Sequence, residues 1–297
     1  MTSLLLQIDL TRPLVHQGPF DVIVHKLSDV IVEAEQDSQS QQLLANFQSY
    51  VSAHPATVLL DPLPAMTRLL DRFASYRIMS ELRDICSPPY LEIHRASEPP
   101  SIQQAMMTQG VSFPLSHGGG LEDIRPPCVL QSFVNHGAVL HKVFVVGDRH
   151  FCVERPSLKN FPSGACDRKT IFFNSHEVSK PESNSDLTAL DGQTASRAPP
   201  SSEAVAALVG ELRVQLGMAL FGVDLIISIH THTLTVIDIN IFPGYEGVPQ
   251  FFSSLLSHIE SVLDQRQSPS SASGAVKSPP LASSPVCWDQ NSRRRFH

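Results

Sequence analysis

The sequence lacks the features that mark several large classes of protein. Its 5 cysteines are odd in number and include no C-x-x-C pair, which argues against a disulfide framework and a structural zinc site. No apolar run reaches the length of a membrane span, and the N-terminal stretch has neither the charge nor the apolar length of a signal peptide. We therefore expect a cytoplasmic protein without membrane insertion.

The sequence also has little positive charge and lacks the commonest phosphate-binding motif. The chain has 22 Lys and Arg against 29 Asp and Glu, a formal net charge of −7, so no global basic field would attract nucleic acid. No G-x-x-x-x-G-K-[ST] segment occurs either. Any site for an anionic ligand must therefore be local and built in another way.

The length of 297 residues suits about two domains. Prolines in Asp61-Pro-Leu-Pro64 indicate a boundary, so we expect an N-terminal α/β domain at 1–62 and a second domain at 63–265. Residues 266–297 are rich in Ser, Pro and Ala, which predicts a disordered tail. In the first domain the pattern predicts strands at 4–10, 21–25 and 56–60 and a helix at 41–53.

The second domain alternates between helical and strand patterns. Apolar positions at helical spacing predict helices at 66–85 and 203–220, the second with Val205, Leu208, Leu212 and Leu216 on one face. Apolar stretches at 128–133, 140–148 and 151–155 predict antiparallel sheet with hairpin connections.

Two acidic residues lie in adjacent apolar stretches near the end of this domain. If the turn between them centres on Thr231, Asp224 faces Asp238 across a hairpin, and period-2 alternation puts Asn240 on the same face. Two facing carboxylates and an amide oxygen suit Mg²⁺, which completes its shell with waters and substrate phosphates. The alternative is an exposed hairpin face with ordinary surface acids.

A second hairpin carries basic residues. Pairing Val146 with Phe151 places Lys142 opposite Arg155, and facing like charges destabilise a hairpin unless an anion joins them. An Arg fork and a Lys point charge together suit phosphate. The alternative is that both side chains extend into water.

Several segments occur in one order over most of residues 15–265, among them His25-Lys-Leu-Ser-Asp29, Arg155-Pro-Ser-Leu-Lys-Asn-Phe161, Leu220-Phe-Gly-Val-Asp224 and Ile237-Asp-Ile-Asn240. In these segments the chain resembles the inositol 1,3,4-trisphosphate 5/6-kinase family, also called inositol-tetrakisphosphate 1-kinases, of the ATP-grasp superfamily. The resemblance implies an α/β ATP-grasp fold with a small, truncated Rossmann-like N-terminal domain. It also implies transfer of the γ-phosphoryl group of ATP to a hydroxyl of inositol polyphosphates such as inositol 1,3,4-trisphosphate and inositol 3,4,5,6-tetrakisphosphate.

The resemblance further implies a site and its partners. We expect a monomer that binds ATP, inositol polyphosphates and two Mg²⁺ ions, with Lys142 and Asp238 as catalytic residues. The implied metal ligands are Asp224, Asp238 and Asn240, and the implied substrate contacts are Lys142, Arg155, Asn240 and Gly244. The implied ATP contacts are Arg72, Gln131, Ser132, Phe133, Val134, Asn135, His136, Gly137, Ala138, Val139, Leu140, His141, Lys142, Ser157, Ser175 and Ser179.

Two family segments find no match in the chain. The family has a strand with an ATP-binding lysine and then a substrate loop where only Leu115-Ser-His-Gly-Gly-Gly120 stands here. It also has a strand and helix, with a substrate-contacting lysine, upstream of the match to 5–10. These departures favour a second hypothesis, a catalytically impaired form that binds nucleotide and inositol phosphate. A third hypothesis, an ATP-grasp carboxylate ligase, shares the metal geometry, but Arg155-Pro-Ser-Leu-Lys159 counts against it.

Overall fold

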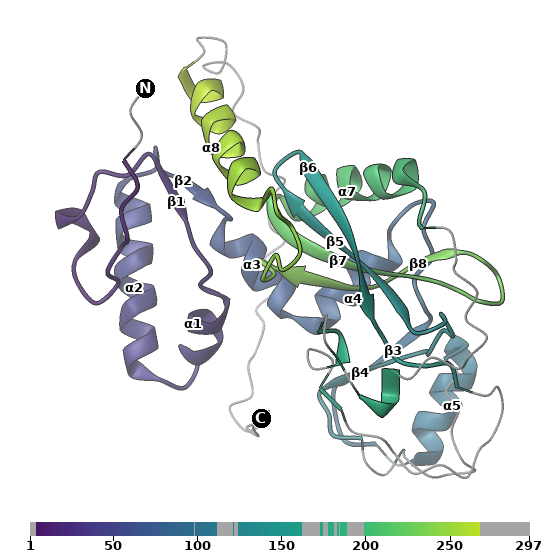
Figure 1. The fold of residues 1–297 in the computed structure, drawn as a ribbon. Coiled ribbons are helices and arrows are strands. Elements are labelled where there is room, and N and C mark those ends of the chain that lie inside the picture. The colour runs from purple at the N-terminus through teal and green to yellow at the C-terminus, as the bar shows by residue number, and fades with distance from the viewer. Residues whose placement is uncertain are drawn as a thin grey trace. The chain divides into compact units, whose positions relative to one another are not determined.

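The computed structural model describes residues 4–97, 99–111, 121, 124–161, 173–174, 178–180, 183, 185–188 and 199–267. The chain divides into two compact units, Met1–Ile259 and Glu260–His297. The first unit holds all the strands that the structure describes (Figure 1). Nearly all of the expected tail lies outside the described residues. None of the described helices has both the length and the apolar character needed to cross a membrane.

The N-terminal part is built on a parallel pair of strands. Strand β1 (Val22–Val24) pairs with β2 (Val58–Leu60) after the helices α1 (Ser28–Glu33) and α2 (Ser38–Ala53), which confirms the expected strands at 21–25 and 56–60 and the helix at 41–53. Asp37 caps α2 by accepting a hydrogen bond of 2.7 Å from the Ser40 N–H.

The strand expected at 4–10 is wrong. This segment has no strand structure and precedes a short 3-10 helix, η1 (Leu14–His16), and the side chains of Leu4 and Leu5 are 81% and 95% exposed. An apolar run becomes a strand only where a neighbouring strand pairs with its backbone N–H and C=O groups.

The expected boundary segment is an ordered connection. After β2, the buried carboxylate of Asp61 accepts hydrogen bonds from the N–H groups of Ala219 (2.7 Å) and Leu220 (2.8 Å). Burial raises the pKa of Asp61, and these two hydrogen bonds oppose the rise. Pro64 lies in the first turn of α3 (Leu63–Leu70), where a missing N–H costs no hydrogen bond. Asp61 therefore ties the end of β2 to the segment that leads into the main sheet.

The single helix expected at 66–85 is wrong, because the pattern covers two helices. Asp71 separates α3 from α4 (Arg72–Ser80) and caps α4 by accepting a 2.9 Å hydrogen bond from the Phe73 N–H. A cap of this kind does not change the apolar spacing, so the spacing alone does not reveal the break. Leu82 and Ile85 pack against the core from beyond the end of α4.

Four antiparallel strands form the main sheet, in the order β6-β5-β7-β8. They are β5 (Val139–Val146), β6 (Arg149–Pro156), β7 (Leu220–Ile227) and β8 (Leu234–Ile241). The expected hairpin between the stretch at 128–133 and β5 is wrong. Instead, β4 (Cys128–Gln131) pairs with β3 (Tyr90–Ile93) in a separate sheet. Beside that sheet, α5 (Pro99–Gln109) contributes Ile102 and Met106 to a local core.

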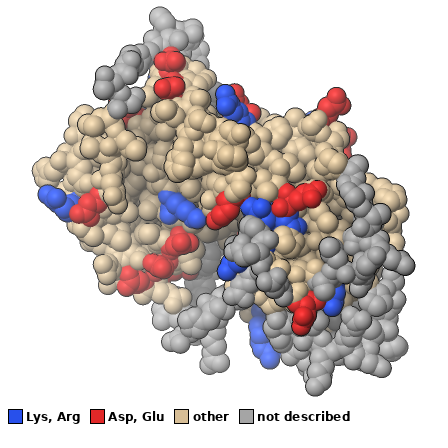
Figure 2. Space-filling model, viewed as in Figure 1, with Lys and Arg blue, Asp and Glu red and all other residues tan. Residues whose placement is uncertain are grey.

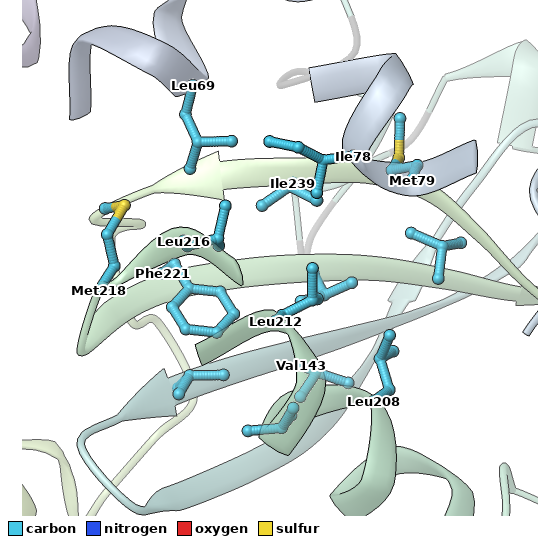
Figure 3. Close-up of a cluster of buried hydrophobic side chains, with 14 of the residues drawn as sticks. Leu69, Ile78, Met79, Val143, Leu208, Leu212, Leu216, Met218, Phe221 and Ile239 are labelled. Carbon is cyan, nitrogen blue, oxygen red and sulfur yellow. The ribbon is translucent and has the colours of Figure 1, made fainter. Parts of the chain in front are cut away.

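One face of the main sheet carries the largest apolar core. Side chains of α3, α4 and α7 (Ser202–Leu216) pack onto this face, as Figure 3 shows for ten labelled residues. The helix expected at 203–220 ends earlier, at Leu216, because Gly217 adopts a left-handed conformation with φ of 65°. The expected apolar face of α7 is confirmed, since Val205, Leu208, Leu212 and Leu216 are all buried.

The opposite face of the sheet is apolar at one end only. Phe144, Val146 and Leu220 pack there with Tyr245 and with Phe251 of α8 (Phe251–Gln267). Farther along the same strands this face continues with Lys142 on β5 and Asp224 on β7. The change from apolar to charged side chains on one continuous face indicates a candidate site at its charged end.

Replacing Asp61 with Asn should lower the free energy of unfolding by about 2 kcal/mol, because an amide accepts through one oxygen and would turn its own donor toward the second buried N–H. Urea unfolding followed by circular dichroism measures the change. The exposed Asp148→Asn in the turn after β5 is the matched control and should change the free energy by less than about 0.5 kcal/mol. Equal effects of the two substitutions would show that the Asp61 connection is not specific.

Candidate active site

The acidic residues meet as the sequence predicts. Asp224 on β7 lies directly opposite Asp238 on β8, and Asn240 lies opposite Gly222 one step along the same face. Directly opposed residues on antiparallel strands have their Cβ atoms about 5 Å apart. The hairpin therefore places two carboxylates and an amide together.

The register of this hairpin depends on a β-bulge. Asp224 pairs with Asp238, but Leu225 pairs with Val236, so Ile237 is an extra residue in β8. The turn is consequently centred half a residue away from the expected Thr231. Since Val236 and Asp238 are two residues apart, a regular strand would put them on one face, whereas the bulge buries Val236 in the core and leaves Asp238 in the site.

Each of the two carboxylates has its own cation. Lys142 on β5 lies opposite Asp224, with its Nζ 3.2 Å from Asp224 Oδ1. Arg72, at the start of α4, donates a 2.8 Å hydrogen bond from Nη1 to Asp238 Oδ1. The two pairs differ in exposure, because the Arg72 side chain is 66% exposed and the Lys142 side chain 18%. Basic and acidic side chains are accordingly intermixed on the face that Figure 2 shows.

The predicted pairing of Lys142 with Arg155 is wrong. Val146 pairs with Arg149, so only Gly147 and Asp148 form the turn, and this register places Val153 opposite Lys142. Gly147 has a φ of 63°, the positive value that a two-residue hairpin turn requires. Lys142 and Arg155 do lie on one face of the sheet, but they are diagonal neighbours. They therefore do not form the facing pair of cations that an anion would join.

Arg155 instead holds the loop that follows β8. Its Nη2 donates a hydrogen bond to the Glu246 carbonyl oxygen, and its guanidinium lies against the Cα of Gly247. Gly244, a predicted substrate contact, is an exposed residue of the same loop. Arg155 therefore connects β6 to the segment that carries Gly244.

The electrostatics of the acidic face fit a hard cation. Burial raises the pKa of Asp224, Lys142 opposes this rise, and the nearby charge of Asp238 adds to it. Asp224 Oδ1 and Asn240 Nδ2 are buried and make no hydrogen bond of good geometry. Among the described residues no three His, Cys, Asp or Glu side chains gather into a complete metal-binding set. The donors present thus suit an ion such as Mg²⁺ that takes its other ligands from water and phosphate.

The segment predicted to border the nucleotide is held against residues 157–161. His136 Nε2 lies 2.8 Å from Ser157 Oγ, so the structure brings these two predicted contacts together. Asn135 exchanges two hydrogen bonds with the backbone of Phe161, and the Gly137 N–H donates to Asn160 Oδ1 (2.8 Å). The connection from β4 to β5 is therefore fixed along its length.

Other predicted contacts are not brought to the acidic face. His141 alternates to the apolar face of β5, where burial lowers its pKa and its Nδ1 lies 3.9 Å from Glu154 Oε1. Ser179 makes no hydrogen bond or ion pair with the acidic face within the described part of the chain. Ser175 and the segment 115–120 lie outside the described residues.

Comparison with known proteins identifies the family of the chain. The sequence model of the inositol 1,3,4-trisphosphate 5/6-kinase ATP-grasp domain matches residues 116–261, and that of the pre-ATP-grasp domain of the same kinases matches residues 2–66. The inositol-tetrakisphosphate 1-kinase of Xenopus laevis is 49% identical over 284 aligned positions, which cover 87% of this chain and 72% of the relative. The chain belongs to the inositol 1,3,4-trisphosphate 5/6-kinase family. The expected α/β ATP-grasp fold is thereby confirmed.

A second relative agrees with this membership. The inositol-tetrakisphosphate 1-kinase of Danio rerio is 48% identical, with the same coverage of both chains. The solved structure of D-alanyl-alanine synthetase A from Vibrio cholerae aligns with 74% of this chain and 72% of its own, at 13% identity and a TM-score of 0.46. The alignment with the Xenopus kinase is 284 positions long, which is more than the 87% of this chain's 297 residues that take part in it. Some residues of the Xenopus kinase therefore have no counterpart in this chain.

The two ion pairs of the acidic face should differ in their effect on stability. Lys142→Met should lower the free energy of unfolding by about 3 kcal/mol, because it leaves the largely buried Asp224 carboxylate without its partner. Arg72→Met should cost less than about 1 kcal/mol, because the Arg72 side chain is 66% exposed and water can replace it beside Asp238. Urea unfolding of both variants without metal or nucleotide gives the comparison.

A second substitution tests the cause of the Lys142 effect. Asp224→Asn in the Lys142→Met protein should recover most of the loss, since it removes the unpaired charge. If this double variant is no more stable than Lys142→Met, the loss comes from packing of the lysine stem and not from charge.

Proposed function

We propose that this protein is a kinase that transfers the γ-phosphoryl group of Mg²⁺-ATP to a ring hydroxyl of an inositol polyphosphate. The observation that carries the proposal is the pair of facing carboxylates, Asp224 and Asp238, with Lys142 beside them. Membership of a kinase family and the names of the Xenopus and Danio relatives support the choice of reaction. We infer acceptors of the class of inositol 1,3,4-trisphosphate and inositol 3,4,5,6-tetrakisphosphate.

The acidic face would hold the metal. Asp224, Asp238 and Asn240 supply the oxygen ligands, and their apolar surroundings strengthen every charge interaction there. When bound, Mg²⁺ supplies charge neutralisation at the transferring phosphate. We assign two ions to the site, as the resemblance to the kinase family implies, and the donors leave coordination positions on them for water and phosphate oxygens.

The basic residues would hold the anions. Lys142 projects from β5, directly opposite Asp224 on β7, where its ammonium can neutralise phosphate charge as well as carboxylate charge. Arg72 reaches the carboxylate of Asp238 from α4 and presents a planar fork suited to phosphate oxygens. We assign Arg155 and Gly244 to the inositol phosphate because Arg155 anchors the loop that carries Gly244.

The chain between β4 and β5 would border the nucleotide. Its hydrogen bonds to residues 157–161 pre-order the backbone from Ser132 to Ala138, so little freedom is lost when ATP binds. We assign residues 131–142, Arg72, Ser157, Ser175 and Ser179 to ATP. In this arrangement catalysis comes from in-line positioning and charge neutralisation, without a covalent intermediate on the protein.

The reaction is tested by incubating the purified chain with γ-labelled ATP, Mg²⁺ and inositol 1,3,4-trisphosphate. We expect label to enter the inositol phosphate, and Asp238→Ala to reduce the rate more than about 100-fold, because the metal loses a carboxylate ligand. Asp148→Ala, the same change at an exposed position, is the control and should retain the full rate. Full activity of Asp238→Ala would remove the metal site from the proposal.

A second candidate function is a binding form without phosphoryl transfer. The gaps in this chain relative to the Xenopus kinase favour it, because a missing segment can remove a nucleotide contact while the acidic hairpin stays intact. A folded chain that binds ATP and inositol phosphates in calorimetry but transfers no label would support this function over the kinase.

A further inference from the structure

Helix α4 contacts the metal-site strand β8 through two residues on one side of the helix. Arg72 and Tyr76 are four positions apart, so they lie above one another on the helix surface. Arg72 binds the carboxylate of Asp238 directly. Tyr76 donates a hydrogen bond of 3.2 Å from its hydroxyl to Gln131 Oε1 at the end of β4.

Gln131 is also hydrogen-bonded to the backbone of β8. Its Nε2 donates a 3.4 Å hydrogen bond to the carbonyl oxygen of Ile237. A carbonyl oxygen can only accept, so the amide nitrogen of Gln131 must face Ile237, and the amide oxygen must face Tyr76. Both polar groups of the Gln131 side chain are therefore engaged within the protein.

Ile237 is the position where β8 needs external support. As the extra residue of the bulge it has no residue opposite it on β7, and β8 is an edge strand of the main sheet. The residue after it is Asp238, whose direction is set by the bulge. A bond to the Ile237 carbonyl thus acts on the orientation of the next side chain.

The surroundings of Tyr76 suit a permanent donor. Burial raises the pKa of Tyr76 to about 12, with a further rise from the charge of Asp238 and an opposing effect of Arg72. The hydroxyl therefore keeps its proton through the neutral pH range. Its ring packs against that of Tyr90, with the two ring centroids 5.3 Å apart.

We propose that Tyr76 is a positioning residue of the metal site, which orients Gln131 so that Gln131 fixes the bulge at Ile237 and directs Asp238 toward Asp224. The inference rests on the proposed function, because it takes Asp238 as a metal ligand. It also assigns the Gln131 side chain to the support of β8, and leaves only its backbone for the nucleotide.

The test compares Tyr76→Phe with Tyr90→Phe, which removes the same hydroxyl from the neighbouring ring. The Tyr90 hydroxyl makes no hydrogen bond to any residue that the structure describes, so it is a matched control. Calorimetry measures the affinity for ADP in the presence of Mn²⁺ and in the presence of EDTA. We expect Tyr76→Phe to weaken binding about 10-fold with Mn²⁺ and to leave binding in EDTA unchanged, as loss of an outer-shell residue would.

A second variant keeps the test decisive. Gln131→Met should reproduce the loss of Mn²⁺-dependent affinity, and Tyr76→Phe should add nothing to it, because both act through one chain of hydrogen bonds. Tyr90→Phe should bind as the unmutated protein does in both conditions.

The outcomes separate the inference from the proposed function. If Tyr76→Phe binds ADP as tightly as the unmutated protein does in both conditions, or loses the same affinity in Mn²⁺ and in EDTA, Tyr76 does not position a metal ligand, and the proposed function stands without this inference. If Mn²⁺ does not strengthen ADP binding by the unmutated protein, the metal site itself is wrong, and the inference falls with it.

Discussion

The repulsion between two facing carboxylates is the constraint on which the site depends. Asp224 and Asp238 lie opposite each other on a sheet face that is apolar at its other end, and the partial burial of both carboxylates makes like charges costly. One cation offsets the charge of each carboxylate: Lys142 from the adjacent strand pairs with Asp224, and Arg72 from α4 pairs with Asp238. The fold therefore has to bring β5, β7 and α4 together so that the two carboxylates can lie side by side.

A second constraint is that the same strands must also build the core. Val223 and Val236 are fully buried on the helix-covered face, while Asp224 and Asp238 occupy the other face. A regular hairpin cannot place Val236 in the core and Asp238 in the site, since residues two apart share a face. The bulge at Ile237 resolves the conflict, at the cost of an irregular edge that the side chain of Gln131 supports.

The parts of the site that could be predicted from the sequence are those that one hairpin determines. A turn centred half a residue earlier would by itself pair Asp224 with Ile237, but the bulge restores Asp238 as its partner, so the prediction tolerated the error. The Lys142 and Arg155 pairing had no such tolerance, because shortening the assumed turn to Gly147 and Asp148 moved the partner of Lys142 by two residues. Contacts between distant segments, such as Asp61 with Ala219 or Tyr76 with Gln131, leave no periodic signal in the sequence.

Charge balance links the stability of the protein to its proposed chemistry. In the chain without ligands, the cations that would meet phosphate are bound to the carboxylates that would meet metal. Lys142 can turn toward an anion without leaving Asp224 uncompensated only if another cation takes its place, because an unpaired carboxylate at this depth is costly. In the proposed kinase, a metal ion bound to Asp224 would take the place of the Lys142 ammonium, and Lys142 would then be free to meet phosphate. The charge balance that stabilises the acidic face without ligands would in this way be kept when ligands bind.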